Sequence, residues 1–247
     1  MHNLLSSSNL KFSSAFLLCI ILISCQNSAD KRSPTDGRKV SSVEQVTFID
    51  VDTVNILTPH KIHLTRLYAQ DNYGINDYRI TSPKMVVIHY TAIPTLDETL
   101  RYFKPDSLNA SRKKIIKKSP LNVGVHYVID KDGSIYNLLP DSIMGRHILG
   151  FNHIALGIEN VARDSSELTV EQLNSNVKLV KYLSNAYPSM QYLIGHQEYD
   201  DHTLPHYTLL KADDPNYQPY PKPDPGADFL EKLRLKLNDD YDLVFEK

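Results

Sequence analysis

The sequence is poor in cysteine, because its 247 residues include only Cys19 and Cys25, both near the N-terminus. The rest of the chain therefore has no thiol for an internal disulfide or for a cysteine nucleophile. An excess of charge of one sign is also missing, since 27 Lys and Arg stand against 29 Asp and Glu, a formal net charge of −2. This balance argues against a nucleic-acid-binding protein, and we expect no nucleic-acid partner.

Long hydrophobic runs are absent as well. The most apolar segment, FSSAFLLCIILIS at 12–24, has 13 residues, which is too short for a transmembrane helix and typical of a signal peptide. Its end, Leu22-Ile23-Ser24-Cys25, resembles a bacterial lipobox. We therefore expect residues 1–24 to be a lipoprotein signal peptide and Cys25 to be the lipidated first residue of the mature chain.

Residues 25–44 are polar and rich in serine, with almost no large apolar side chains. Such a segment cannot support a hydrophobic core, so we interpret it as a flexible tether that follows the lipidated cysteine. The acyl chains on Cys25 would anchor the protein to a membrane. Because the next residue is Gln26, resemblance to other lipoproteins favours the bacterial outer membrane. The predicted location is the cell envelope, with a lipid anchor.

Apolar runs alternate with helical patterns in the rest of the chain, which predicts a mixed α/β layer fold. Three short apolar runs, at 85–90, 154–159 and 191–196, are expected to form central strands that are covered on both faces. Runs at 125–130 and 134–139 flank an Asp-Gly turn and predict a β-hairpin. We therefore expect a single α/β domain with a central mixed β-sheet flanked by helices.

Helix start signals lie between these runs. Thr95 and Thr169 each begin a T-x-x-E/Q capping box, in which the hydroxyl and the acidic or amide side chain satisfy free backbone N–H groups. The second box predicts a helix over 170–187, and an apolar pattern predicts a closing helix over 229–237.

Each of the three predicted strands ends in a residue that can bind a metal or transfer a proton, namely His89, Glu159 and His196. Ligand sites in sheets flanked by helices lie just beyond the strand ends, so these side chains are expected to meet in one crevice. The chain has no G-x-S-x-G, P-loop, G-x-G-x-x-G or H-E-x-x-H signature that would indicate another chemistry.

A metal centre is therefore the open option for these strand ends. Two imidazoles and a carboxylate, with the fourth position left to water, are the usual composition of a hydrolytic zinc site. Such a site needs a third protein ligand. The residues alone leave His202, His206 and Asp224 as candidates, and their spacing does not choose among them.

Five motifs follow one another in the chain: VVIHYTA at 86–92, NVGVHYVIDKDGSIY at 122–136, GRHILGFNHIALGIEN at 145–160, LIGH at 193–196 and KPDPG at 222–226. With these motifs the chain resembles the zinc-dependent N-acetylmuramoyl-L-alanine amidases, whose superfamily also holds phage lysozyme-like amidases and animal peptidoglycan recognition proteins. The resemblance covers roughly 81–233.

This resemblance implies a Zn²⁺ cofactor and a set of site residues. His89, His196 and Asp224 match the family's three zinc ligands. Glu159 stands where bacterial members carry a catalytic glutamate, and Lys222 matches a lysine of the catalytic members, expected to steady the oxyanion.

A further motif of the family lines the substrate groove. By the same resemblance, Arg146, His147 and Asn152 are expected to contact substrate, with the Arg146 guanidinium suited to pair with a carboxylate. His126 and His153 also match family positions, but we interpret them as structural and leave them outside the metal shell.

The function implied is hydrolysis of the amide between N-acetylmuramic acid and L-alanine in peptidoglycan or muropeptides. The alternative is a non-catalytic, peptidoglycan-binding lipoprotein, since some members of the superfamily bind without cleaving. Residues 45–80 carry no usable motif and are interpreted as an extension packed on an amidase domain at 81–247. His196 and Asp224 lie 28 positions apart, further than in most relatives, which predicts an insertion at about 197–219.

Overall fold

A six-stranded sheet lies at the centre of the protein, for which a computed structural model describes residues 49–112, 119–211 and 220–247. The strands follow the order β1-β4-β3-β5-β2-β6. β3 and β4 pair antiparallel, and the other neighbours pair parallel, so the predicted mixed sheet is confirmed. The strands are β1 Asp52–Thr53, β2 Met85–Tyr90, β3 Tyr127–Ile129, β4 Ile135–Asn137, β5 Ala155–Asn160 and β6 Tyr192–Gly195.

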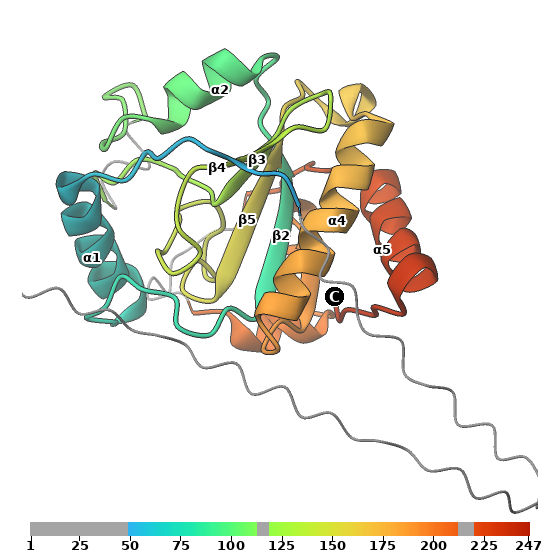
Figure 1. The fold of residues 1–247 in the computed structure, drawn as a ribbon. Helices are drawn as coiled ribbons and strands as arrows, with labels where there is room; N and C mark the ends of the chain where they lie inside the picture. The colour runs from blue at the N-terminus through green and yellow to red at the C-terminus, as the bar shows by residue number, and fades with distance from the viewer. Residues whose placement is uncertain (1–48, 113–118, 212–219) are drawn as a thin grey trace, which may run out of the picture. The chain divides into compact units, whose positions relative to one another are not determined.

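Helices cover the sheet on both sides. Figure 1 shows α4 and α5 together on one side and α1 and α2 on the other. No helix in the described ranges is long and apolar enough to cross a membrane. The helices are α1 Pro59–Tyr73, α2 Leu96–Phe103, α4 Val170–Ala186 and α5 Ala227–Tyr241, with 3₁₀ turns η1 Ser165–Glu167, η2 His196–Glu198 and η3 Pro205–Leu209.

The predicted helix starts are confirmed. The Thr95 hydroxyl accepts a hydrogen bond from the Glu98 backbone N–H at the start of α2. Thr169 and Gln172 form the complete capping box of α4, with both reciprocal hydrogen bonds of 3.0 Å. The closing helix α5 is longer at both ends than the predicted segment.

The last predicted strand differs from its expected place. β6 pairs with β2 alone among the named strands and is therefore the last strand of the sheet and not a central one. Its side chains are nevertheless buried, because the C-terminal segment covers its outer edge, where the Glu246 carbonyl accepts the Leu193 N–H at 3.1 Å. A continuous apolar run thus marked burial on both faces correctly, but it did not identify a central strand.

The alternation of side chains along β2 divides the core into two parts. Val86 and Ile88 join the large hydrophobic cluster that includes residues of α4 and α5. Met85 and Val87 point to the opposite face and pack with Phe151 and other residues of a second cluster. His89 continues this second series, so the fold places it on the face opposite α4 and α5.

The segment before the first family motif is built into the same core. β1 adds a parallel strand beside β4, and α1 contributes Leu64, Tyr68 and Ala69 to the large hydrophobic cluster. The helix begins after Thr58, whose side chain accepts the Lys61 N–H, and ends at Gly74, whose φ of 65° is the left-handed conformation that favours glycine.

α1 is also tied to α2 by a buried lysine. The Lys61 ammonium donates to the Phe103 and Lys104 carbonyls at 3.0 and 3.2 Å, at the C-terminal end of α2. This position is favourable for a cation, because it satisfies free carbonyls and faces the negative end of the helix dipole. Burial lowers the pKa of the Lys61 ammonium to about 8.

Several expectations concern residues outside the described ranges. The signal peptide at 1–24, the lipidated Cys25 and most of the remaining N-terminal segment lie there, as does the 212–219 part of the expected insertion. The lipid anchor and the envelope location therefore stay predictions.

The side chain of Gln172 joins α4 to the sheet by hydrogen bonds at the ends of β3 and β5. Its side chain is fully buried, and its amide nitrogen donates to the Ile129 and Val161 carbonyls, both at 3.1 Å. We expect Gln172→Met, which keeps the size but not the polar atoms, to lower the free energy of unfolding by about 1–3 kcal/mol, because two buried carbonyls lose a donor and the Thr169 N–H loses its acceptor. Urea unfolding measures this change. The exposed Asn174→Met on the same helix is the control, and an equal effect of both substitutions would contradict the role of the amide.

His126 is a core histidine with both ring nitrogens engaged. Its Nε2 donates to the Ile143 carbonyl at 2.9 Å, and its Nδ1 accepts the Gly157 N–H at 3.0 Å. Only the neutral imidazole can make both bonds, since the protonated ring has no acceptor. Burial, the largest influence, lowers the pKa of His126 below its ordinary value of 6.5.

This histidine predicts a loss of stability in acid. In the unfolded chain His126 takes up a proton near pH 6.5, whereas the folded ring stays neutral to lower pH, so its contribution is present above pH 6.5 and is lost as the pH falls toward the lowered value. His126→Gln removes this titrating group. Between pH 7 and 5, the slope of the unfolding free energy against pH should fall by up to about 1.4 kcal/mol per pH unit, which is the value for one proton. Identical slopes for both proteins, measured by urea unfolding, would refute this.

Candidate metal centre

Three electron-pair donors from distant parts of the chain meet at the ends of β2 and β6. The atoms are His89 Nδ1, His196 Nδ1 and Asp224 Oδ2, and each of the three distances between them is 3.0 Å. Among the residues described, these are the His, Cys, Asp or Glu side chains that form a group able to hold a metal ion. The structure thus brings together the three residues that the family resemblance pointed to.

The spacing of these atoms suits a small divalent ion. Three ligands of a tetrahedral zinc ion at 2.0–2.1 Å lie about 3.3 Å apart, close to the triangle seen here. Unprotonated imidazole nitrogens and a carboxylate oxygen repel one another at this distance unless a cation or a proton lies between them. The donor set and its geometry therefore fit zinc.

Ionisation at the cluster also suits a cation. Burial, with the neighbouring His89, lowers the pKa of His196 to about 4, so the ring is neutral at pH 7. Burial works to raise the pKa of Asp224, but its hydrogen bonds to His196 and His89 prevail and hold that pKa below its ordinary value. Neutral imidazoles and a carboxylate are the protonation states that bind metals.

Asp224 reaches His196 because the chain closes on itself at two places. The Gln197 N–H donates to the Asp224 carbonyl at 2.9 Å. Gly195 permits this approach, because a Cβ at that position would lie 2.8 Å from Pro225 Cδ. Further out, the Tyr199 hydroxyl accepts the Tyr220 N–H at 3.0 Å and donates to the Tyr220 carbonyl at 3.3 Å. These contacts join the turn after His196 to the segment that carries Asp224.

The other two candidates for a third ligand lie elsewhere. His202 is exposed, and its ring contacts that of Tyr207 at a centroid distance of 4.4 Å. His206 is fully buried with its ring 5.5 Å from that of Phe151, and in the described part of the chain neither ring nitrogen has a hydrogen-bond partner. The geometry therefore favours Asp224 over both histidines.

Glu159 lies beside His89 on the neighbouring strand. The register of β5 and β2 pairs these two residues directly, so their side chains project from the same face of the sheet. Glu159 Oε2 is buried and has no hydrogen-bond partner among the described residues. Burial, partly offset by His89, raises the pKa of Glu159 to about 7. A carboxyl group with such a pKa can accept and return a proton near neutral pH.

Lys222 stands two residues before Asp224 and is half-buried. Its charge acts on the same groups, since it lowers the pKa values of both Glu159 and His196. The Lys222 ammonium lies 5.6 Å from the ring centroid of Tyr220, whose side chain is 74% exposed. The cluster thus has an acid-base group and a cation at its border.

His147, expected to contact substrate, lies directly behind His89. Its Nδ1 is 3.1 Å from His89 Nε2, on the side of the His89 ring away from the three-atom cluster. The ring packs tightly against β5, because a Cβ on Gly157 would lie 2.7–2.8 Å from three of its atoms. Burial, followed by the neighbouring histidines, lowers the pKa of His147 well below its ordinary value.

Asn152 and Arg146 are engaged within the protein. Asn152 is 1% exposed, and its side-chain oxygen accepts the backbone N–H groups of His147 and Ile148. The Arg146 guanidinium is buried, donates to the carbonyls of Ser119 and Leu121, and lies 5.0 Å from the ring centroid of Tyr68. Both residues therefore have partners inside the protein, and their expected contact with substrate stays a prediction.

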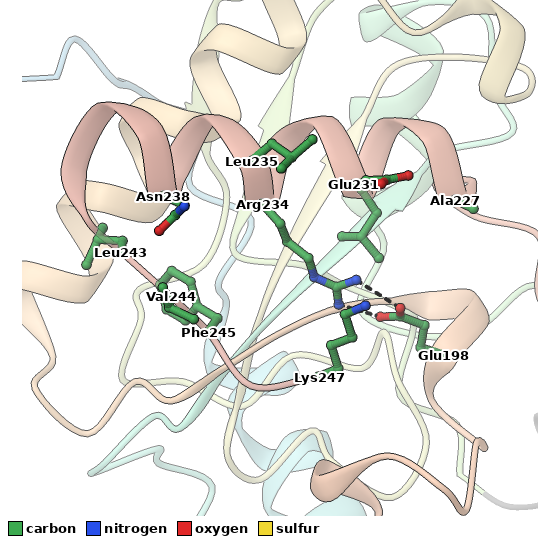
Figure 2. A pocket seen from close by; sticks show the side chains of 11 residues that line it. Glu198, Ala227, Glu231, Arg234, Leu235, Asn238, Leu243, Val244, Phe245 and Lys247 are labelled. Atoms are coloured by element: carbon green, nitrogen blue, oxygen red, sulfur yellow. Dashed lines mark hydrogen bonds and ion pairs between the residues drawn. The ribbon is translucent and has the colours of Figure 1, made fainter.

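The turn that presents His196 is supported from behind by an ion pair. Arg234 of α5 donates to both carboxylate oxygens of Glu198, at 3.0 and 2.7 Å, as Figure 2 shows. Arg234 also donates to the Leu193 carbonyl, and Glu198 accepts the Gly195 N–H at 3.1 Å. These bonds hold the chain in place on both sides of His196, at Gly195 and at Glu198.

A cavity of about 570 Å³ lies beside this ion pair, between α5 and the C-terminal segment. Figure 2 shows Leu235, Val244 and Lys247 around it. His89, His196 and Asp224 do not line this cavity, so it is separate from the candidate metal centre.

The N-acetylmuramoyl-L-alanine amidase family matches residues 79–215, more than half of the chain. No curated protein matches the chain. Solved structures are also similar to it, and three of them serve as examples. The first is the endolysin N-acetylmuramoyl-L-alanine amidase LysCS from Clostridium intestinale URNW, with 22% identity, 78% of this chain and 98% of that chain covered, and a TM-score of 0.49.

The second is an AmpD derivative, with 16% identity, 77% of this chain and 97% of that chain covered, and a TM-score of 0.45. The third is peptidoglycan recognition protein-LE in complex with tracheal cytotoxin, a monomeric diaminopimelic acid-type peptidoglycan. It has 22% identity, with 51% of this chain and 76% of that chain covered, and a TM-score of 0.40. On the extent of the family match, the chain belongs to the N-acetylmuramoyl-L-alanine amidase family.

Proposed function

We propose that the protein is a zinc-dependent enzyme that hydrolyses the amide bond between N-acetylmuramic acid and L-alanine in peptidoglycan or muropeptides. Membership of the amidase family supports the choice of bond. The observation that carries the proposal is the triangle of His89, His196 and Asp224, with Glu159 on the adjacent strand. A binding protein without catalytic activity would not need a proton acceptor beside a metal site.

His89, His196 and Asp224 would hold the zinc ion. When bound, zinc would polarise the scissile carbonyl and make a water molecule more acidic. The protein supplies a fixed donor set, because His89 lies in a central strand, His196 follows an edge strand, and Asp224 is joined to the turn after His196 by a backbone hydrogen bond of 2.9 Å.

Glu159 would act as the general base and then as the general acid. Its carboxylate accepts a proton from the attacking water as the new C–O bond forms. It then gives this proton to the amide nitrogen as the C–N bond breaks, so that L-alanine leaves as a free amine. A pKa of about 7, raised by burial, allows both transfers near neutral pH.

Lys222 would stabilise the negative charge that develops on the carbonyl oxygen. A half-buried ammonium is suited to this role, because a charge in a partly water-excluded site interacts more strongly than one in bulk water. Its influence on the pKa values of Glu159 and His196 supports a position at the same site.

The direct test is cleavage of purified muropeptides by residues 26–247, with products identified by mass spectrometry. We expect free stem peptides that begin at L-alanine. Activity should be lost when a chelator removes the metal and restored by added zinc. Muropeptide binding without cleavage, in protein shown to contain zinc, would refute the enzyme and favour the recognition function.

Variants separate the ligands from the catalytic groups. We expect His89→Ala to lose bound zinc, measured by elemental analysis, because one of three ligands is removed. Glu159→Gln and Lys222→Ala should keep zinc but lose turnover, by about 10²–10⁴-fold for the proton acceptor and about 10²–10³-fold for the oxyanion donor. The exposed Glu171→Gln and Lys178→Ala on α4 are matched controls. Unchanged turnover in either catalytic variant would remove that residue from the mechanism.

A further inference from the structure

A tyrosine of α1 is connected to the candidate metal centre through buried side chains, although α1 precedes the residues that the amidase family matches. We propose that Tyr68 is a positioning residue that holds His89 in its ligand orientation through Asn152 and His147. The inference rests on the proposed function, because it concerns the zinc ligand His89.

The first contact joins α1 to the loop before β5. The Asn152 side-chain amide donates to the Tyr68 hydroxyl at 2.9 Å. Both side chains are almost completely buried, with 2% of Tyr68 and 1% of Asn152 exposed. Water does not replace such a bond readily, so its loss leaves a buried donor without a partner.

The second contact shapes that loop. The Asn152 side-chain oxygen accepts the backbone N–H groups of His147 and Ile148, at 3.0 and 2.9 Å. An amide can do this only when its nitrogen faces the opposite way, and here the nitrogen faces the Tyr68 hydroxyl. The two backbone N–H groups set the orientation of the Asn152 amide, and the Tyr68 hydroxyl holds the amide in place by accepting from its nitrogen.

The third contact reaches the ligand. His89 can offer Nδ1 to a metal only when its proton is on Nε2, and Nε2 then donates to His147 Nδ1 at 3.1 Å. The two rings are nearly perpendicular, with an interplanar angle of 89°. Gly157 lies close against one side of the His147 ring and leaves no free space there. A shift of the His147 backbone must therefore change the contact between His147 and His89.

Tyr68 itself is held in place by its surroundings. Leu64 and Ala69 of the same helix lie in the hydrophobic core, and the Arg146 guanidinium lies over the Tyr68 ring. Arg146 is in turn fixed by its hydrogen bonds to the carbonyls of Ser119 and Leu121. The hydroxyl that meets Asn152 thus has a defined position, which a positioning residue requires.

The test is Tyr68→Phe, which removes the hydroxyl and keeps the ring. The zinc dissociation constant of the full chain is measured by competition with a chromophoric chelator. Removal of an outer partner of a metal-bound histidine typically weakens metal binding by about 10–100-fold, and since Tyr68 acts through two residues we expect the lower end, about tenfold. We expect KM for muropeptides to change little, because Tyr68 does not touch the cluster.

Tyr127→Phe is the matched control, because it also removes the hydroxyl of a buried tyrosine. That hydroxyl donates to Asp141 at 2.7 Å and takes no part in the contacts between Tyr68 and His89. It should destabilise the fold in thermal unfolding and leave the zinc dissociation constant unchanged. A double-mutant cycle completes the test. If Tyr68 acts through Asn152, Tyr68→Phe combined with Asn152→Ala binds zinc as Asn152→Ala alone does.

The outcomes separate the two proposals. Zinc binding by the wild type with equal affinity in Tyr68→Phe would overturn the positioning role and leave the proposed function intact. Equal weakening in Tyr68→Phe and Tyr127→Phe would also overturn it, since the effect would then follow general stability. A wild type that does not bind zinc would overturn the proposed function, and the inference with it.

Discussion

The structure depends on holding three electron-pair donors 3.0 Å apart in a site that is largely shielded from water. Such atoms repel one another unless a cation or a proton lies between them. Each donor is fixed in a different way. His89 belongs to a central strand, His196 begins a turn supported by the Glu198–Arg234 ion pair, and Asp224 is joined to that turn through the Gln197 N–H. A bound cation would relieve any repulsion among the three donors.

Much of the fold could be predicted because its signals are local. The runs that became β2 and β5, the hairpin around the Asp-Gly turn and the capping box at Thr169 each depend on a few neighbouring residues, and the structure confirms them. The meeting of His89 and His196 followed from the rule that parallel strand ends share an edge. Asp224 did not follow from spacing, because the backbone bond that brings it to His196 joins residues 27 positions apart. Only the family resemblance selected it.

The remaining features depend on contacts between distant segments, and local patterns do not reveal them. Arg146 and Asn152 are expected at the substrate groove by resemblance alone, and the sequence gives no sign of their hydrogen bonds to Ser119, Leu121 and Tyr68. The segment that forms β6 was expected to be a central strand because its residues are apolar. A strand edge covered by a C-terminal segment has the same apolar pattern as one covered by another strand. The start and end of α1 did have a local signal, Thr58-Pro59 followed by Gly74, which is the usual pairing of proline inside a helix start with glycine after its end.

The position of α1 changes what counts as the functional unit. The family match begins at residue 79, but the core is not complete without Leu64, Tyr68 and Ala69, and the buried Lys61 closes the end of α2. A loop that carries His147 toward His89 needs a fixed support on its other side, and the described residues supply that support from α1 through Asn152. A metal ligand that is misplaced by even a fraction of an ångström loses affinity, so under the proposed positioning role a helix that does not touch the metal contributes to its binding. The segment before the family motifs is therefore part of the site's construction, and not only a covering of the domain.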